Sequence, residues 1–528
     1  MSIRLATLIP LLACAMLLVG CTVRPVSPAA AAAPGSTGVP PVSATRRSGA
    51  SGVWYEIFVR AWYDTNGDGI GDLDGVTARL DYLKSLGVDG IWLMPINSSP
   101  SYHGYDTTDY RAINPQYGSL ADFHRLVGEA HKRGIRVILD LVVNHTSDRH
   151  PWFLAARDPA DPRHDWYSWA APGVDLHAAS ATGGPAWHAL GKQHYLGTFT
   201  ATMPDLDFDT PAVRMAVSDI GRYWLAQGVD GFRLDAARHI FGDFAADADD
   251  PAVLRRNLAW WTAFHRAMAA ICPDVYLVGE VTRDDPKRLA PWFGPLNAVF
   301  DFPLASQLVD SARSERNGAL GDLLTRTAAA IPAGQDAPFL SNHDQERVMS
   351  QLAGNAAHMR TAAAMLLTLP GRAFVYYGEE LGMRGRKPDP DLREPMRWHR
   401  DPDGAGESRW KRFSAGDGAD VSVDAEQDDA RSLLTWYRML IGWRRDLPVL
   451  RDGALSVPAV ANLHVAAWEL ADDGDDVLVV HNLSHQPQPL KLDGALKHFR
   501  RVRLASQPDA RIDGGQLHLP AYASVILE

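Results

Sequence analysis

The sequence predicts an α/β protein built on a closed barrel of eight parallel strands, with an inserted domain and a C-terminal β-sandwich. Short runs rich in β-branched and aromatic residues recur eight times between residues 53 and 380, and longer helix-like segments separate them. This alternation is typical of a parallel sheet, and eight repeats favour a (β/α)8 TIM barrel. At roughly 150 residues per domain, the 528 residues are enough for two to four domains.

The expected strands run from VWYEIFV to AFVYYGEE. They begin at Val53, Gly90, Arg136, Val229, Val275, Asn297, Ala337 and Ala373. Amphipathic helical patterns occupy the intervals, at 73–86, 119–133, 211–227, 251–271 and 346–367. The barrel is therefore expected to span residues 52–143 and 204–446.

Two regions fall outside the eight-fold pattern. The connection between the third and fourth strands, residues 144–203, is rich in Trp, His, Pro and Gly. A connection of that length is usually functional or a small inserted domain. After residue 446, alternating runs such as LHVAAWEL from Leu463 and DVLVVHNL from Asp476 predict an antiparallel β-sandwich over residues 447–528.

The first 51 residues predict an exported protein held at a membrane. Arg4 and the apolar stretch from Leu5 to Gly20 form a secretory signal over residues 1–20. Its end, LVGC, resembles a bacterial lipobox in which Cys21 carries lipid; an ordinary signal peptide with a coincidental cysteine is the alternative. Residues 21–51 are rich in Pro and Ala and predict a tether. We therefore expect a lipid anchor at the outer membrane, in the periplasm or at the cell surface.

The composition excludes several classes of protein. A formal net charge of −11 repels phosphate backbones, so nucleic acid is not an expected partner. Three cysteines in the whole chain rule out a disulfide-stapled scaffold and leave no cluster for zinc. We expect a monomer whose contact with the membrane is the lipid anchor alone.

Three carboxylates close predicted barrel strands: Asp235 ends GFRLD, Glu280 ends YLVGE, and Asp344 ends FLSNHD. Barrel enzymes carry their chemistry at the carboxyl ends of the strands, where the loops converge. Acidic residues in such positions also cap helices. Three of them at one rim fit a retaining glycosidase, which uses one carboxylate as nucleophile and a second as acid and base, about 5–5.5 Å apart.

The segments around these acids appear in a fixed order. They are DLVVNH (140–145), MPDLD (203–207), GFRLDAARH (231–239), GEV (279–281) and FLSNHD (339–344). Together they resemble the signature segments of the α-amylase family, glycoside hydrolase family 13, and the resemblance covers residues 52–528. It implies a retaining enzyme that cleaves α-1,4-glucosidic bonds in starch or maltooligosaccharides through a covalent glycosyl-enzyme intermediate.

The resemblance also implies a role for each carboxylate. Asp235 would be the nucleophile, Glu280 the general acid/base, and Asp344 the residue that stabilises the transition state by binding sugar hydroxyls. Arg233, two residues before the nucleophile, can keep Asp235 ionised.

Further residues match positions that bind sugar in the family. At the cleavage subsite these are His103, Tyr105, His145 and His343. On the leaving-group side, Arg238 and His239 stand where α-amylases usually have Lys-His. Ala236, next to the nucleophile, fits α-1,4 cleavage better than α-1,6 cleavage.

Two segments, NHDQERVMSQ (342–351) and KPDPDLREPMRW (387–398), resemble a branch intermediate between α-amylases and oligo-1,6-glucosidases. In glucosidases of the family, residues matching Asp106 and Arg393 pair and close the non-reducing side. Such a pair would favour chain ends over cuts within a chain. An exo-acting α-glucosidase or a transglycosylase is therefore one alternative function. A non-catalytic carbohydrate-binding lipoprotein is another, although such relatives lose one or more of the three carboxylates.

The segment DTNGDGIGDLDG (64–75) predicts a structural Ca²⁺ site. Side-chain oxygens of Asp64, Asn66, Asp68 and Asp72 and the carbonyl of Ile70 follow the spacing of a calcium loop. An EF-hand would need a Glu at position 12, which is Gly75 here. The spacing resembles the calcium loop after the first strand in this branch of the family; an Asp/Gly-rich turn without metal is the alternative.

Overall fold

The computed structural model describes residues 52–241, 250–413 and 416–528. The predicted signal peptide, Cys21 and the tether lie outside these residues. In the part of the chain that is described, no helix has both the length and the apolar character needed to cross a membrane.

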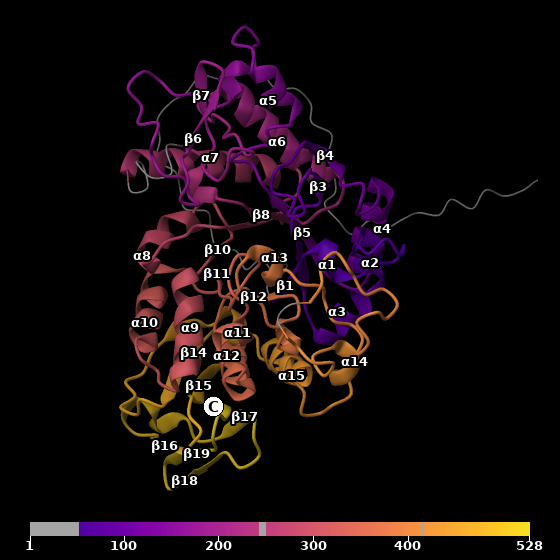
Figure 1. Ribbon diagram of the computed structural model, residues 1–528. Coiled ribbons are helices and arrows are strands. Elements are labelled where there is room, and N and C mark those ends of the chain that lie inside the picture. Colours follow the sequence, from indigo (N-terminus) through magenta and orange to yellow (C-terminus); the bar gives the residue numbers. More distant parts are fainter. Residues whose placement is uncertain (1–51, 242–249, 414–415) are drawn as a thin grey trace, which may run out of the picture.

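The centre of the molecule is a sheet of eight parallel strands in the order β11-β10-β9-β8-β5-β2-β1-β12 (Figure 1). Their bounds are β1 Val53–Ile57, β2 Gly90–Leu93, β5 Arg136–Leu141, β8 Gly231–Leu234, β9 Tyr276–Gly279, β10 Ala298–Phe300, β11 Asp336–Ala337 and β12 Ala373–Tyr376. Two backbone hydrogen bonds join the outer strands, from Arg372 N to Asp336 O (2.6 Å) and from Phe374 N to Pro338 O (2.9 Å). The sheet therefore closes, and the predicted eight-stranded barrel is confirmed.

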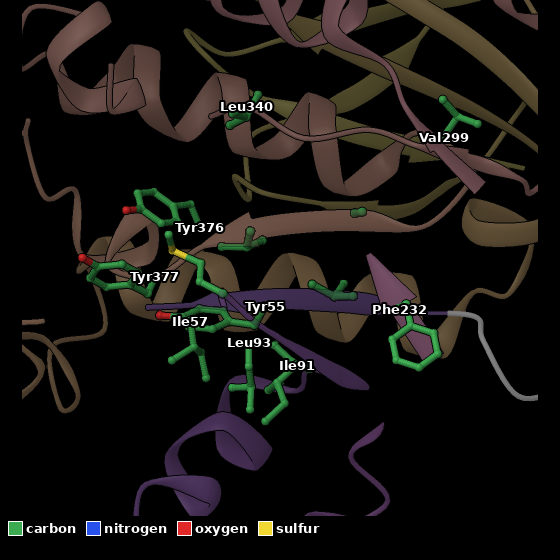
Figure 2. Close-up of a cluster of buried hydrophobic side chains, with 14 of the residues drawn as sticks. Tyr55, Ile57, Ile91, Leu93, Phe232, Val299, Leu340, Tyr376 and Tyr377 are labelled. Carbon is green, nitrogen blue, oxygen red and sulfur yellow. The ribbon is translucent and has the colours of Figure 1, made fainter. Parts of the chain in front are cut away.

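Alternation along the strands sorts side chains to the two faces of the barrel wall. The inner layer contains aromatic rings, and Trp54 of β1 stacks on Tyr276 of β9 with 4.8 Å between ring centroids. The outer layer packs against the helices and includes Tyr55, Ile57 and Ile91 (Figure 2). Because both faces are covered, the strands carry near-continuous apolar runs.

Helices follow most strands, as predicted. The longer ones are α3 Leu80–Leu86, α4 Leu120–Lys132, α6 Pro211–Ala226, α7 Pro251–Ala269, α9 Phe302–Ser314, α10 Leu320–Ala330, α12 Ala356–Thr368 and α15 Leu433–Asp446. Shorter ones are α1 Val59–Trp62, α2 Leu73–Ala78, α5 Pro151–Ala156, α8 Pro286–Leu289, α11 Val348–Gln351, α13 Asp389–Leu392, α14 Val423–Glu426 and α16 Val449–Asp452. The helix expected at 346–367 is interrupted, because Ala353 and Gly354 adopt positive φ angles of 53° and 77° between α11 and α12.

The segment between β5 and β8 carries α5 and a hairpin of β6 Trp187–Leu190 and β7 Gln193–Leu196. Isolated bridges pair His145 with Asp205 and Tyr167 with Leu206, so both ends of this insertion are tied together beside the barrel rim. A second hairpin, β3 Asn97–Ser98 with β4 Asp109–Ile113, follows β2.

The C-terminal region forms two antiparallel sheets, as predicted. One contains β13 Ala454–Ser456, β14 Val465–Ala471, β15 Asp476–Asn482, β20 Ser524–Leu527 and β17 Val502–Ala505; the other contains β16 Gln488–Lys491, β19 Gln516–Leu519 and β18 Arg511–Asp513. Buried side chains such as Leu478 and Leu517 form their shared core. Trp468 Nε1 donates to the Thr368 carbonyl (3.2 Å), which joins β14 to the end of α12.

Candidate active site

Three carboxylates meet around one guanidinium at the carboxyl ends of β5, β8 and β9. Arg233 is 1% exposed, and its Nη1 donates to Asp140 Oδ1 (2.9 Å) and Asp235 Oδ1 (2.5 Å). Its Nη2 donates to Glu280 Oε2 (2.8 Å), and its guanidinium lies 5.1 Å from the centre of the Trp92 ring. The sheet register places Asp140 opposite Arg233, so both side chains face the same side of the wall. The geometry therefore brings the predicted nucleophile and acid together.

Burial controls the ionisation of this cluster. It raises the pKa of Asp235 and of Glu280, and in both cases the Arg233 guanidinium opposes the rise. The negative charges of Asp235 and Asp344 raise the pKa of Glu280 further. Burial also raises the pKa of Asp140 to about 7. One guanidinium cannot neutralise three carboxylates, so the cluster holds a proton more readily than free carboxyl groups do, as a general acid requires.

Asp344 is held ionised at the mouth of the barrel. Its Oδ1 accepts from Arg393 Nη2 (2.9 Å), and its Oδ2 lies 3.2 Å from His343 Nε2. Although burial opposes the effect, the charges of His343 and Arg393 hold its pKa well below the usual range. The Asp344 side chain is nevertheless 49% exposed, so it presents a charged surface to a ligand.

The predicted sugar-binding aromatics form one group beside these acids. The Tyr105 hydroxyl donates to Asp140 Oδ2 (3.0 Å), and the Tyr105 ring stacks on His343 with 5.4 Å between centroids. The His103 ring also stacks on the Tyr105 ring, with 6.1 Å between centroids. The Nε2 of His145 lies 3.1 Å from the Tyr105 carbonyl, and burial lowers the pKa of His145 to about 4. His145 is therefore neutral at physiological pH.

Arg393 does not pair with Asp106 in this structure, unlike the matching residues in glucosidases of the family. Arg393 pairs with Asp344 (2.9 Å) and with Asp389 (3.5 Å), which lies four residues earlier as the first residue of α13. Asp106 is buried and accepts hydrogen bonds from Ser99 Oγ (2.6 Å) and from Ser101 Oγ. Across the described residues no ion pair joins the two, because each is nearer to other polar partners.

The predicted leaving-group residues follow directly from β8. Ala236 adopts a positive φ of 44°, which turns the chain into the short helix Ala237–His239. Arg238 Nη1 donates to the Thr282 carbonyl (2.8 Å), and burial lowers the pKa of Arg238 to about 10. The carbonyl of His239 accepts from Asn144 Nδ2 (2.6 Å). Both side chains therefore start at the same rim as Asp235.

The predicted calcium residues lie on the turn between α1 and α2. Asp64 accepts from the amides of Gly67 (2.7 Å) and Gly69 (2.8 Å), and Asp72 caps α2 by accepting from the Gly75 amide (2.6 Å). Carboxylate, amide and carbonyl oxygens are the ligands that Ca²⁺ prefers. Among residues 52–241, 250–413 and 416–528, however, no three His, Cys, Asp or Glu side chains gather as a metal cluster. The donor types fit calcium, whereas the carboxylates are here engaged with backbone amides.

Two charged residues of the site were missed in the sequence. Glu56 lies within β1 and Asp140 within β5, and both are buried. The sequence did contain a signal for both, because a carboxylate inside an otherwise apolar strand must face a polar partner within the barrel.

A stacked aromatic pair beside Arg393 was also missed. Tyr102 and Trp410 lie 5.3 Å apart with nearly parallel rings, and Trp410 Nε1 donates to the Arg393 carbonyl (3.1 Å). These two residues are more than 300 positions apart in sequence. Since they belong to separate loops, no local pattern could have paired them.

Comparison with known proteins agrees with this geometry. The family "Alpha amylase, catalytic domain" matches residues 56–453, and "Alpha-amylase SusG C-terminal domain" matches residues 465–526. Alpha-amylase 3 of Dictyoglomus thermophilum is 35% identical over 483 residues, covering 90% of this chain and 93% of that protein. The trehalose synthase/amylase TreS of Mycobacterium tuberculosis is 33% identical over 509 residues, covering 84% of this chain and 83% of that protein. The solved alpha-amylase from H.orenii superimposes with a TM-score of 0.84 at 41% identity, covering 91% of this chain and 99% of that chain. The chain therefore belongs to the α-amylase family, glycoside hydrolase family 13, and is an enzyme of that family.

Proposed function

We propose that the protein is a retaining glycosidase that hydrolyses α-1,4-glucosidic bonds in starch or maltooligosaccharides. The observation that carries the proposal is the sharing of one guanidinium by two carboxylates: Arg233 binds Asp235 through Nη1 and Glu280 through Nη2. Such sharing keeps the two carboxyl groups close. Retaining enzymes separate them by about 5–5.5 Å, whereas inverting enzymes need about 6.5–9.5 Å to admit a water molecule between the general base and the sugar.

The chemistry then proceeds in two steps. Protonated Glu280 gives its proton to the glycosidic oxygen while Asp235 attacks the anomeric carbon, which breaks the glycosidic bond and forms a glycosyl ester. In the second step Glu280 takes a proton from water, the resulting hydroxide attacks the anomeric carbon, and Asp235 leaves as a free carboxylate. Asp344 remains ionised and stabilises positive charge on the sugar ring.

Chromatography of early products from soluble starch and from maltoheptaose tests the proposal. We expect mixed maltooligosaccharides from the purified protein and none from Asp235→Asn. Asp310→Asn is the matched control, because that carboxylate lies on the exposed surface of α9 and pairs with Arg313. Sugar binding without any hydrolysis would support the non-catalytic carbohydrate-binding alternative instead.

An exo-acting α-glucosidase or a transglycosylase is the second candidate. Arg393, which pairs with Asp344, lies beside the stacked rings of Tyr102 and Trp410. Together these side chains would limit the length of glucan that can bind next to Asp344. Early release of glucose or maltose alone would favour this candidate. In that case Trp410→Ala should increase the share of longer products, and an added sugar acceptor would reveal transfer.

We also propose a structural Ca²⁺ held by Asp64, Asn66, Asp68, the Ile70 carbonyl and Asp72. The order of oxygen donors along one glycine-containing turn supports it. Gly67 and Gly69 there have φ angles of 82° and 88°, which residues with a Cβ rarely adopt. The ion would stabilise the barrel, because it would tie the loop after β1 to the start of α2.

Finally, we propose that residues 1–20 are cleaved and that Cys21 is lipidated. The exported, monomeric enzyme would then be anchored at the outer membrane, in the periplasm or at the cell surface by a tether over residues 21–51. The lipobox-like sequence LVGC supports this proposal. Labelling with a fatty acid should mark the native protein and not Cys21→Ala, and size-exclusion chromatography of the released protein should give the mass of a monomer.

A further inference from the structure

We propose that Glu56 is a positioning residue of this site, which holds His343 as an imidazolium that donates from both ring nitrogens and thereby fixes Asp344 for sugar binding. This inference rests on the proposed function for the role of Asp344. It concerns binding of the sugar and the orientation of Asp344, so it can be tested without hydrolysis.

Glu56 reaches the site from the first strand of the barrel. Its neighbours Tyr55 and Ile57 pack in the outer layer (Figure 2). Strand alternation therefore turns Glu56 inward, to the face on which Trp54 lies. The Glu56 side chain is only 2% exposed. A carboxylate so buried destabilises the fold unless a cation compensates for it. Its Oε1 lies 2.5 Å from His343 Nδ1, which forms that ion pair.

The opposite nitrogen of the same ring also faces a carboxylate. His343 Nε2 lies 3.2 Å from Asp344 Oδ2 and 2.7 Å from the Tyr105 hydroxyl. A neutral imidazole has one N–H, so it can donate to only one of two carboxylates. The protonated ring has two and satisfies both Glu56 and Asp344. Because the Tyr105 hydroxyl donates its single proton to Asp140 Oδ2 (3.0 Å), it accepts from His343 Nε2, which must then carry a hydrogen. With Nδ1 facing Glu56, the contacts therefore favour the imidazolium.

The charged surroundings of His343 point the same way. Asp344 and Glu56 together raise the pKa of His343 to about 10, although burial opposes the rise. The groups that contact it are Glu56 from β1, Tyr105 from the loop before β4, the adjacent Asp344, and Arg393, whose Nε donates to the His343 carbonyl (3.0 Å). The carboxylates of Asp140 and Asp235 also interact with its charge. The Trp92 ring from β2 meets its edge at 5.6 Å and adds no charge.

Loss of the Glu56 charge should disturb Asp344. In Glu56→Gln, the amide oxygen can still accept from Nδ1, so a neutral His343 would carry its proton there. Its Nε2 would then direct a lone pair at Asp344 Oδ2, and the attraction between them would become repulsion. Arg393 would be left to hold Asp344 through Oδ1 alone.

Calorimetric binding of maltoheptaose between pH 6 and pH 9 tests this inference in a Glu280→Gln background, which removes the general acid and prevents turnover. We expect the affinity of the parent to change less than twofold, and that of Glu56→Gln to fall about tenfold as pH rises. Glu56→Asp keeps the charge and should restore a flat profile at a weaker affinity. Glu379→Gln is the matched control, because Glu379 is another buried barrel glutamate, bonded to Tyr437 (2.8 Å).

A flat profile for Glu56→Gln would overturn the proposal. Nitrogen NMR of labelled histidines in the native protein, with His343 assigned by His343→Gln, gives a second readout that does not need a folded Glu56 variant. His343 should carry two protons at pH 8, and a neutral ring at that pH would refute the inference. If the parent bound no maltooligosaccharide, the proposed function would fail, and the NMR result would still decide the ionisation that Glu56 imposes.

Discussion

Replacing Arg233 with lysine is the sharpest perturbation of the carboxylate cluster. The guanidinium makes three charge-assisted hydrogen bonds from two nitrogens in a fixed plane. A lysine ammonium keeps the charge but has no planar fork, so it cannot hold Asp140, Asp235 and Glu280 in the same positions. We assume that the lysine variant loses two of these three hydrogen bonds. A hydrogen bond to a charged group contributes about 1.5–3 kcal/mol, so the total is about 3–6 kcal/mol.

This loss of interaction free energy should affect both the stability of the fold and the rate of catalysis. If half of it appears in the transition state, kcat/KM falls by roughly 10–100-fold, since each 1.4 kcal/mol is about one factor of ten. The rest should appear as a lower midpoint of thermal unfolding. The assay is the steady-state rate on maltoheptaose, with circular dichroism to confirm folding. Arg125→Lys is the control, because Arg125 is exposed and pairs with two surface aspartates. Folded Arg233→Lys with kcat/KM within threefold of the native value would refute the reasoning.

Three further predictions concern stability. Although burial opposes it, hydrogen bonds from Tyr522, His485 and His358 lower the pKa of Glu315 to about 2 from 4.5. The stabilisation is therefore present above about pH 4.5 and is lost as pH falls toward 2. Glu315→Gln should lower the free energy of unfolding by about 1–2 kcal/mol at pH 6 and by almost nothing at pH 2. Urea unfolding at both pH values measures this difference. Burial and then the neighbouring Asp301 raise the pKa of Asp336 well above 3.8. An acid with a raised native pKa lowers stability as pH rises, so Asp336→Asn should stabilise the protein by about 1–2 kcal/mol at pH 7 in the same measurement, and a loss would contradict the charge argument. Chelation by EDTA should lower the thermal midpoint and Ca²⁺ should restore it; an unchanged midpoint would argue for a turn without metal.

The sequence was informative wherever function follows from position along a strand. All strands of a parallel barrel end at one rim, so the sequence alone places Asp235 after GFRL and Glu280 after YLVG together. Arg233 could be placed beside them for the same reason, because two residues along a strand return to the same face. The extent of β11 could not be predicted: the strand was expected to begin at Ala337, whereas Asp336 and Ala337 are the two residues that form it.

Long-range pairing was beyond the sequence. The sequence left open whether Asp106 and Arg393 pair, and the fold places Asp344 and Asp389 beside the arginine and two serines beside Asp106. The distance between loops depends on how the whole barrel packs, and no local pattern encodes it.

The sequence by itself determined the barrel, the C-terminal sheets and the set of acids at the rim, because strand period and apolar burial are local properties of the chain. Only the tertiary structure decided which charge neutralises which. Glu56 and His343 are 287 residues apart and meet because β1 and the loop after β11 border one interior. Arg233 and Asp235 pair along one strand, but a buried carboxylate such as Glu56 finds its cation across the barrel, so that partner is set by closure of the sheet and not by distance along the chain.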